Sequence, residues 1–282
     1  MTTLTLQGLH LDPAIIERIA AVAGAARTVA IGSSAFRCEG VSPETRPQVE
    51  TLCAEYQLDC AFLPDNHGRD YKLIAMDMDS TLITIECIDE IADMQGLKEE
   101  VSAITEAAMR GEIDFPESLA RRVALLKGLD ASALQRVYDE RLALSPGALP
   151  MLEAMRAAGI KTLLVSGGFT FFTDRLKERL QLDYTHANVL EVADGKLTGK
   201  VIGAVVDAEE KRSRLLAVCA ELGIVPSQAI AMGDGANDLR MMDAAGLSVA
   251  FRAKPAVRAK ADVALNFVGL DGVLAFLNLA HR

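Results

Sequence analysis

The chain has 282 residues, half of them hydrophobic, which is enough for one large core and a smaller module. Its 39 acidic and 29 basic residues leave a formal net charge of -10, which disfavours nucleic acid as a partner because the phosphate backbone is also negative. The first ten residues lack the basic and apolar regions of a signal peptide, and no apolar run is long enough to span a membrane, so we expect a cytoplasmic protein without membrane contact.

Residues 1–66 are predicted to form a small α+β module of their own. Their apolar spacing predicts strands and helices in the order βαββαβ, which is typical of a four-stranded antiparallel sheet with helices on one face, the ferredoxin-like pattern. The turn-rich stretch PDNHG at 64–68 predicts a linker to the rest of the chain. The pattern resembles an ACT domain, which implies a regulatory role or the pairing of two copies into a homodimer.

Residues 72–82, with the sequence KLIAMDMDSTL, begin the main part of the chain. A short apolar run at 73–76 predicts a buried strand, and Asp77 and Asp79 follow where the strand ends. Ligands of open α/β sheets bind outside the carboxyl ends of the strands, and two aspartates beside an apolar strand indicate a compensating cation. Residues 77–81, DMDST, would also suit a polar turn that caps the next helix.

Residues 87–145 are helical in pattern and are predicted to form an inserted helical cap. After it, strands at 161–165, 229–232, 248–251 and 263–265 alternate with helices, a hairpin is predicted at 189–201, and a last helix at 272–279. This alternation predicts a doubly wound, mostly parallel α/β sheet of the Rossmann type. We therefore expect the core to consist of residues 67–86 and 146–282, interrupted by the cap.

Two further strand ends and one helix start are candidate parts of the site. Ser166, Gly167 and Gly168 suit a small oxyanion, although they would also suit an ordinary glycine-rich turn. The sequence GDGAND at 233–238 supplies Asp234 and Asp238, the hard oxygen ligands that Mg²⁺ prefers, and the next residues, LRMMDAAG, do not fit a calcium loop. Lys211 is predicted at a helix start, where the macrodipole opposes it, so either a bound anion or a solvated charged run explains it.

These motifs together resemble those of the haloacid dehalogenase-like hydrolases. The match covers the chain from about Tyr71 onwards and rests on DMDST at Asp77–Thr81, SGG at Ser166–Gly168, Lys211 and GDGAND at Gly233–Asp238. Within that superfamily the chain is closer to the phosphoserine phosphatases, because Glu86, Ile88, Asp89 and Glu90 follow the first motif and FPESLARRVALLKG follows at 115–128.

The resemblance implies a phosphatase that works through a covalent intermediate. Asp77 would attack phosphorus and become an aspartyl-phosphate. Asp79, close to the phosphate and a second carboxylate, should have a raised pKa and serve first as acid and then as base. Mg²⁺ would be held by Asp77, the Asp79 carbonyl and Asp234, with Asp238 nearby. Ser166, Gly167 and Lys211 would contact the phosphoryl oxygens, and Asn237 would position Lys211 or a phosphate oxygen.

The resemblance also implies the substrate, O-phosphoserine, and the last step of serine biosynthesis. Glu86 would pair with the substrate ammonium group and Arg122 with its carboxylate. Met109 and Phe115, at apolar positions of the cap, would cover the site. On its own residues, Arg122 would equally suit the solvated face of an amphipathic helix.

Two other functions fit the same residues. The first is a phosphatase or phosphotransferase of the same superfamily that acts on another small phosphorylated metabolite. The second is a non-catalytic amino acid sensor built on a former enzyme, but such a relic is expected to lose its nucleophile or its lysine, and this chain retains both.

Overall fold

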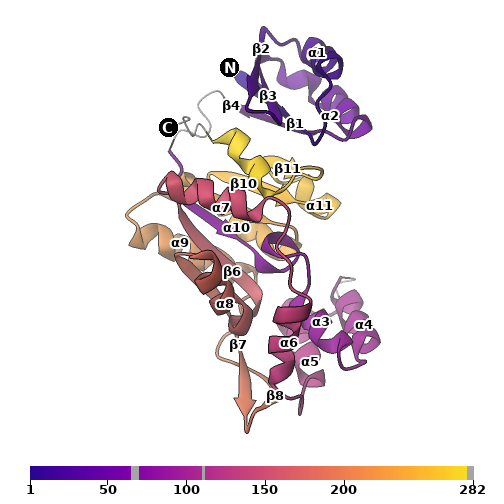
Figure 1. Cartoon of the computed structure of the whole chain (residues 1–282), viewed down its shortest axis with the longest axis vertical. Helices are drawn as coiled ribbons and strands as arrows, with labels where there is room; N and C mark the ends of the chain where they lie inside the picture. The colour runs from indigo at the N-terminus through magenta and orange to yellow at the C-terminus, as the bar shows by residue number, and fades with distance from the viewer. Residues whose placement is uncertain (65–69, 110–111, 278–282) are drawn as a thin grey trace.

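A computed structural model describes residues 1–64, 70–109 and 112–277. The chain forms one four-stranded and one seven-stranded sheet, and a separate group of helices. Figure 1 shows the small sheet at one end of the molecule, the large sheet in the middle, and helices α3 to α6 at the other end. In the described part of the chain, no helix combines the length and apolar character needed to cross a bilayer.

The small sheet confirms the predicted ferredoxin-like order of elements. The elements are β1(Thr2–Gln7), α1(Pro13–Val22), β2(Arg27–Ile31), β3(Ala35–Val41), α2(Arg46–Glu55) and β4(Asp59–Pro64). The strand order is β2-β3-β1-β4 and every pairing is antiparallel. Asp12 caps α1 by accepting a hydrogen bond from Ala14 N, and Pro13 follows at the first helical position, which is why the helix begins there.

The small sheet packs partly against the rest of the chain through strand β4. Ala61 and Leu63 of β4 belong to the hydrophobic cluster of the large sheet. The buried Asp59 carboxylate accepts hydrogen bonds from the backbone N–H groups of Asn266, Phe267 and Val268 at 2.7, 3.0 and 3.0 Å. These donors compensate the burial of the charge, so the contact between the two sheets is polar as well as apolar.

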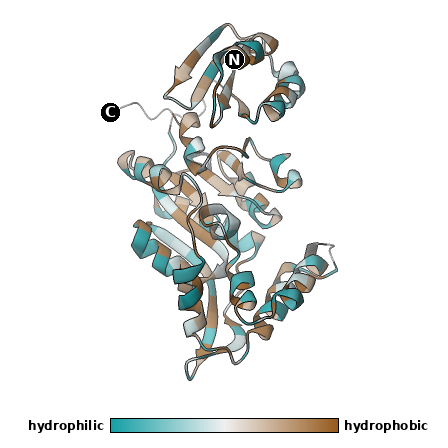
Figure 2. Cartoon of the chain, turned by 45° about the vertical axis from the view of Figure 1, so that its right-hand side comes forward, coloured by the Kyte–Doolittle hydropathy of each residue, from teal (hydrophilic) through white to brown (hydrophobic). Residues whose placement is uncertain are grey.

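The large sheet confirms the predicted doubly wound, mostly parallel fold. Its strands are β5(Leu73–Met76), β6(Lys161–Phe169), β7(Tyr184–Ala193), β8(Lys196–Ile202), β9(Ala229–Gly233), β10(Leu247–Phe251) and β11(Val263–Leu265). They lie in the order β11-β10-β9-β5-β6-β7-β8, and only β7 and β8 pair antiparallel, as the predicted hairpin. Figure 2 shows the central strands largely in the hydrophobic colour.

Helices cover both faces of the large sheet. Alternate residues of each central strand accordingly belong to two different hydrophobic clusters. Ile74 and Met76 of β5 pack with the cluster that includes helices α7 and α8, whereas Leu73 and Ala75 pack with α9 and α10. These helices are α7(Ala148–Ala157), α8(Thr170–Leu180), α9(Ala208–Glu221), α10(Leu239–Ala244) and the short α11(Pro255–Arg258). The strand β5 is therefore buried on both faces, which explains its continuous apolar sequence.

Several predicted boundaries differ from the structure, most clearly in four elements. Strand β6 continues to Phe169, past the glycines at which it was predicted to end, and β7 begins at Tyr184 because its polar first half pairs with β6. Helix α9 begins at Ala208, where Asp207 caps it, so Lys211 lies in its first turn and does not open it. The predicted last helix is a 3-10 helix that begins two residues earlier, at Leu270–Phe276, and its predicted end lies outside the described residues.

The segment between β5 and α7 is helical, as predicted. It contains α3(Cys87–Asp93), α4(Lys98–Met109), α5(Phe115–Leu125) and α6(Ser132–Glu140). The loop after α5 is held by the hairpin of the large sheet, since Gly128 N donates to Leu197 O and Leu197 N donates to Leu129 O, both at 2.8 Å. Figure 1 shows these helices grouped beside the end of the large sheet that carries β7 and β8.

Candidate active site

The carboxyl ends of three neighbouring strands meet at one edge of the large sheet. Met76 of β5 pairs in register with Met232 of β9 and with Leu164 of β6, so the residues that follow each strand lie side by side. A cavity of about 780 Å³ opens there between the strand ends and the helical segment. Among the predicted site residues, its lining includes Asp77, Asp79, Glu86, Phe115, Arg122, Gly167, Asp234 and Asn237.

Asp77 and Asp238 share one fully buried lysine. The Nζ atom of Lys211 lies 2.6 Å from Asp77 Oδ2 and 2.7 Å from Asp238 Oδ1. The two carboxylates outweigh the cost of burial and raise the pKa of Lys211, so it stays charged. Burial and the charge of Asp238 raise the pKa of Asp77, and the Lys211 ammonium opposes them. One ammonium group does not balance the negative charge gathered here.

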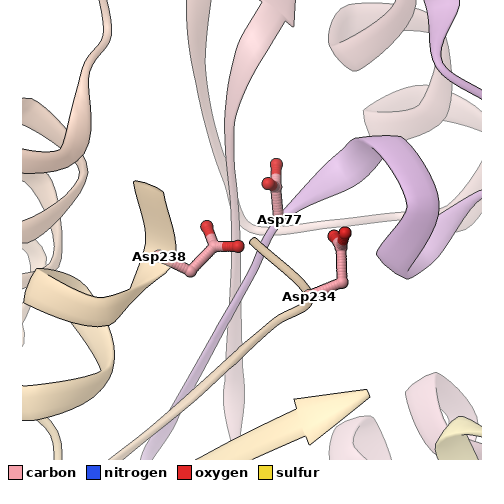
Figure 3. Close-up of side chains that lie close together, drawn as sticks. All are labelled: Asp77, Asp234 and Asp238. Carbon is pink, nitrogen blue, oxygen red and sulfur yellow. The ribbon is translucent and has the colours of Figure 1, made fainter. Parts of the chain in front are cut away.

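Asp234 adds a third carboxylate to this pair. Ligand atoms of Asp77, Asp234 and Asp238 all lie within 4.8 Å of one another, and Figure 3 shows the three side chains gathered at the ends of their segments. Thr81 Oγ1 donates to Asp234 Oδ1 at 3.0 Å. Burial, and secondly the charge of Asp238, raises the pKa of Asp234 to about 6. The cluster can hold a metal ion, because its three carboxylates offer oxygen ligands close to one another and a cation would offset the repulsion between them.

Asp79 sits between the helical segment and the glycine-bearing strand. Its Oδ1 accepts a hydrogen bond from Cys87 N at 2.9 Å and its Oδ2 from Ser166 Oγ at 3.4 Å. The pKa of Asp79 is raised, as predicted, but the largest cause is burial and not a neighbouring charge. A carboxyl group that holds its proton more strongly than usual can act as a general acid.

The turn after Asp79 has an unusual backbone. Ser80 has φ of 55°, in the left-handed region that residues other than glycine seldom adopt. Its hydroxyl donates to Glu86 Oε1 at 2.6 Å, and its N–H donates to Ile85 O at 3.1 Å. The protein around the Glu86 carboxyl group, and secondly the charge of Asp79, raises the pKa of Glu86 to about 7. The turn therefore aims Glu86 into the mouth of the cavity.

The glycines after Val165 leave room that a side chain would fill. A Cβ at Gly168 would lie 2.6 Å from Asp79 Oδ2 and 3.1 Å from Ser166 Oγ. A Cβ at Gly167 would lie 2.9 Å from the Phe115 ring of α5. Gly168 N donates to Ser166 Oγ at 2.8 Å, which fixes the hydroxyl beside the cavity. A side chain at either glycine would therefore displace Asp79 or Phe115 from its place in the site.

Arg122 and its neighbour Arg121 have different environments. Arg121 is exposed and forms an ion pair with Glu117 on the same helix. Arg122 is half-buried, lines the cavity and donates to Ser118 O at 3.4 Å. Burial lowers its pKa, while Asp89, Glu86 and Asp79 oppose the shift. The guanidinium of Arg122, unlike that of Arg121, can therefore meet a molecule in the cavity.

Asn237 and Met109 are two further predicted site residues. Lys211 is positioned by Asp77 and Asp238, so holding it does not require Asn237, whose side chain lies near Gly235 at the cavity wall. A contact between Asn237 and a phosphate oxygen stays a prediction. Met109 ends α4, but its side chain lies outside the described residues.

Sequence reasoning missed three residues of the site. Thr81, which binds Asp234, could have been found from its place in the first motif. Asp89 lines the cavity, and its Oδ1 is buried without a hydrogen-bond partner among the described residues. Asn188, which is buried in β7 and holds Gly167, has no signal in the sequence, because a lone asparagine in a polar stretch predicts a turn or surface.

The fold and the acidic strand ends together define a class of hydrolases. The family model of the haloacid dehalogenase-like hydrolases matches residues 74–243, and a model described as a domain of unknown function matches residues 4–49. The phosphoserine phosphatase of Polaromonas sp. is 61% identical over 216 residues, which are 75% of this chain and 92% of that protein.

Solved structures agree with this comparison. An unliganded probable phosphoserine phosphatase from Vibrio cholerae superposes with a TM-score of 0.84 and 41% identity, covering 98% of this chain and 86% of that one. A phosphoserine phosphatase described as a phospho-aspartyl intermediate analogue superposes with a TM-score of 0.70 and 41% identity, covering 74% of this chain and all of that one. The chain belongs to the haloacid dehalogenase-like hydrolases, and within them to the phosphoserine phosphatase family. It is a phosphoric monoester hydrolase.

Proposed function

We propose that the protein is a Mg²⁺-dependent phosphatase that hydrolyses O-phosphoserine to serine and inorganic phosphate through an aspartyl-phosphate. The observation that carries the proposal is the buried Lys211 between Asp77 and Asp238, with Asp79 beside Ser166 after the same strand. The relative whose structure is described as a phospho-aspartyl intermediate analogue supports the covalent step.

In the proposed reaction Asp77 is the nucleophile. A carboxylate oxygen of Asp77 attacks phosphorus, the bond from phosphorus to the serine oxygen breaks, and Asp79 gives its proton to that oxygen. Asp79 then takes a proton from water as the water attacks the aspartyl-phosphate, which releases phosphate and restores Asp77. The raised pKa of Asp79 fits the first of these roles. Ser166, Gly167 and Lys211 stabilise the charge on the phosphoryl oxygens.

The carboxylate cluster fits Mg²⁺ as the cofactor. Asp77, Asp234 and the Asp79 backbone carbonyl would hold the ion, with Asp238 nearby; they offer the hard oxygen atoms that Mg²⁺ prefers. Burial, and secondly the charge of Asp238, raises the pKa of Asp234, and a cation at the cluster would oppose both effects. When bound, the ion supplies neutralisation of the phosphoryl oxygens.

Mg²⁺ binding is expected to weaken as the pH falls below about 6, because protons compete for Asp234. Below that pH the apparent dissociation constant should rise about tenfold per pH unit. Without metal, the folded protein binds a proton between pH 3.8 and about 6 that the unfolded chain does not bind, so its stability falls as the pH rises through that range. Calorimetric titration of the full chain with MgCl₂ at about pH 5, 6 and 7.5 measures the first effect. An affinity that is the same at all three would contradict the proposal. Asp234→Asn is expected to weaken the pH dependence without removing it, because the pKa of the second ligand, Asp77, is also raised.

Glu86 and Arg122 are proposed to select the amino acid part of the substrate. They line the same cavity as the acidic cluster, and their opposite charges suit the ammonium and carboxylate groups of serine. A bound ammonium group would lower the pKa of Glu86 from about 7 and keep it charged. Phe115, whose ring lies against Gly167, would close the cavity on this side, and Met109 is proposed to do so as well.

Arg122→Ala is expected to raise KM for O-phosphoserine about 10- to 100-fold, because a charge-assisted pair with the substrate carboxylate is lost. Hydrolysis of a phosphate ester without a carboxylate, such as p-nitrophenyl phosphate, should change little. Arg121→Ala is the matched control and should leave KM unchanged, since Arg121 pairs with Glu117 at the surface. A similar loss with both esters would assign Arg122 to the phosphate or to folding, and would favour a different phosphorylated substrate.

The remaining assignments concern the whole chain. We propose that residues 1–66 are an ACT-like module, 67–86 with 146–282 the catalytic core and 87–145 the cap, and that two copies pair through the module. The separate hydrophobic cluster of the module supports the division, and the incompletely buried strand β2 is the surface proposed for pairing. Light scattering of the full chain and of Val29→Asp on β2 tests the pairing, and a monomer mass for the unaltered chain would contradict it.

The organic product of the proposed reaction is serine, so we place the reaction last in serine biosynthesis. We propose the cytoplasm as its location.

A further inference from the structure

Asn188 of β7 joins two segments of the candidate site. Its side chain is buried, with 1% of the residue exposed. The Nδ2 atom donates to Gly167 O at 2.8 Å, and Oδ1 accepts from Val206 N at 2.8 Å. Both partners are backbone groups that lie 18 and 21 residues away in the chain, so the amide forms a link that local structure would not provide.

The Asn188 side chain takes the place of backbone hydrogen bonds that are interrupted between β6 and β7. Strands β6 and β7 pair regularly as far as Val165 and again at Phe169, opposite Asn188, but their register is interrupted between these residues. The interruption covers Ser166, Gly167 and Gly168, whose backbone therefore has no ladder partner on this side. Gly167 is half-buried, and a carbonyl removed from water without a partner is costly, so the Asn188 amide supplies a donor that Gly167 O would otherwise lack.

Only an asparagine-sized amide satisfies both groups. Gly167 O can only accept a hydrogen bond and Val206 N can only donate one, which sets the orientation of the amide. Aspartate would keep the acceptor but place a second oxygen against the Gly167 carbonyl. Leucine, of similar size, would remove the hydrogen-bond partner of both backbone groups, the half-buried one at Gly167 and the buried one at Val206.

The two linked segments carry different parts of the site. Gly167 lies between Ser166 and Gly168, beside Asp79. Val206 precedes Asp207, the residue that caps α9, and Lys211 lies in the first turn of that helix. The distance between the glycine-bearing loop and the lysine is therefore set partly through Asn188. An anion can contact the glycine-bearing loop and Lys211 at the same time only if their separation is fixed.

We propose that Asn188 is a positioning residue that holds the glycine-bearing loop and the N-terminus of α9 together, so that Gly167 and Lys211 bind one phosphoryl group. This proposal rests on the proposed function only in that the anion is the phosphoryl group of the substrate. Asn188 itself does not touch the substrate.

The test compares Asn188→Asp and Asn188→Ser with the unaltered full chain. Calorimetric titration with inorganic phosphate in the presence of MgCl₂ should show affinity lowered at least about tenfold in both variants, with the aspartate variant weaker because of the added charge. For O-phosphoserine, kcat/KM should fall about 10- to 100-fold, because small displacements of positioning groups have effects of that size. Inhibition by serine, which would be bound by Glu86 and Arg122, should stay within about twofold of its original strength.

Thr162→Val is the matched control. Thr162 lies at the other end of β6, is buried, and exchanges hydrogen bonds with Asp183. This variant should lose thermal stability without losing phosphate affinity. Unchanged phosphate affinity in a folded Asn188→Ser protein would overturn the proposal, as would an equal loss in Thr162→Val. Because phosphate binding is measured directly, the result stands even where O-phosphoserine proves not to be the substrate.

Discussion

Asp77→Asn should lower kcat for O-phosphoserine about 10⁴-fold or more, the size of loss seen when a nucleophile is removed. Hydrolysis of phosphate monoesters is accelerated by up to ~10²¹-fold in enzymes, whereas acid–base catalysis contributes only about 10²- to 10⁴-fold. Asp79 alone therefore cannot supply the rate. An amide at position 77 has nearly the same shape as the carboxylate but does not attack phosphorus, so the variant isolates the covalent step.

Phosphate release, measured with enough enzyme to detect a single turnover, is the assay for this variant. Asp243→Asn provides the control, because Asp243 is an exposed aspartate on α10 that does not line the cavity. Trapping of radiolabelled phosphate on the unaltered protein, and its absence from Asp77→Asn, would identify the aspartyl-phosphate directly. Turnover of Asp77→Asn at the original rate would disprove the proposed mechanism, whatever the other residues do.

Lys211→Met should abolish activity and also destabilise the fold by about 3–5 kcal/mol, the usual cost of leaving a buried charge without its partner. Lys211 is fully buried and contacts two carboxylates, so its removal leaves Asp77 and Asp238 facing each other. Methionine keeps the length and most of the volume of the side chain, which limits the effect to the lost charge. Urea unfolding of the metal-free protein measures the change.

Two conditions should reduce the loss in Lys211→Met. Lowering the pH protonates the carboxyl groups and removes the unpaired charges, so the difference from the unaltered chain should shrink. Added Mg²⁺ should restore part of the stability, because the ion supplies positive charge at the same cluster. Lys161→Met, which breaks an exposed ion pair with Asp183, is the control and should change little. A Lys211→Met protein as stable as the control would show that the buried pairs contribute nothing to the fold.

The chemistry at the strand ends could be predicted from the sequence. An aspartate or a glycine after a short apolar strand marks the carboxyl end of that strand, and parallel strands align those ends at one edge. That reasoning places Asp77, Ser166 and Asp234 together, and in the structure Asp77 and Asp234 line one cavity while Ser166 bonds to Asp79. The helical insertion and the ferredoxin-like order of the first 64 residues were readable for a similar reason, since apolar spacing reports which face of an element is buried.

Contacts between distant residues were decided only by the tertiary structure. Lys211 is 134 residues from Asp77, and its helical position alone left a solvated lysine equally acceptable. The difference between Arg121 and Arg122, the pKa of Glu86 near 7 and the two hydrogen bonds of Asn188 all depend on which groups the fold brings together and buries. Local pattern determines which element forms and which side it buries, whereas burial and charge at a site are sums over neighbours that the chain supplies from far away.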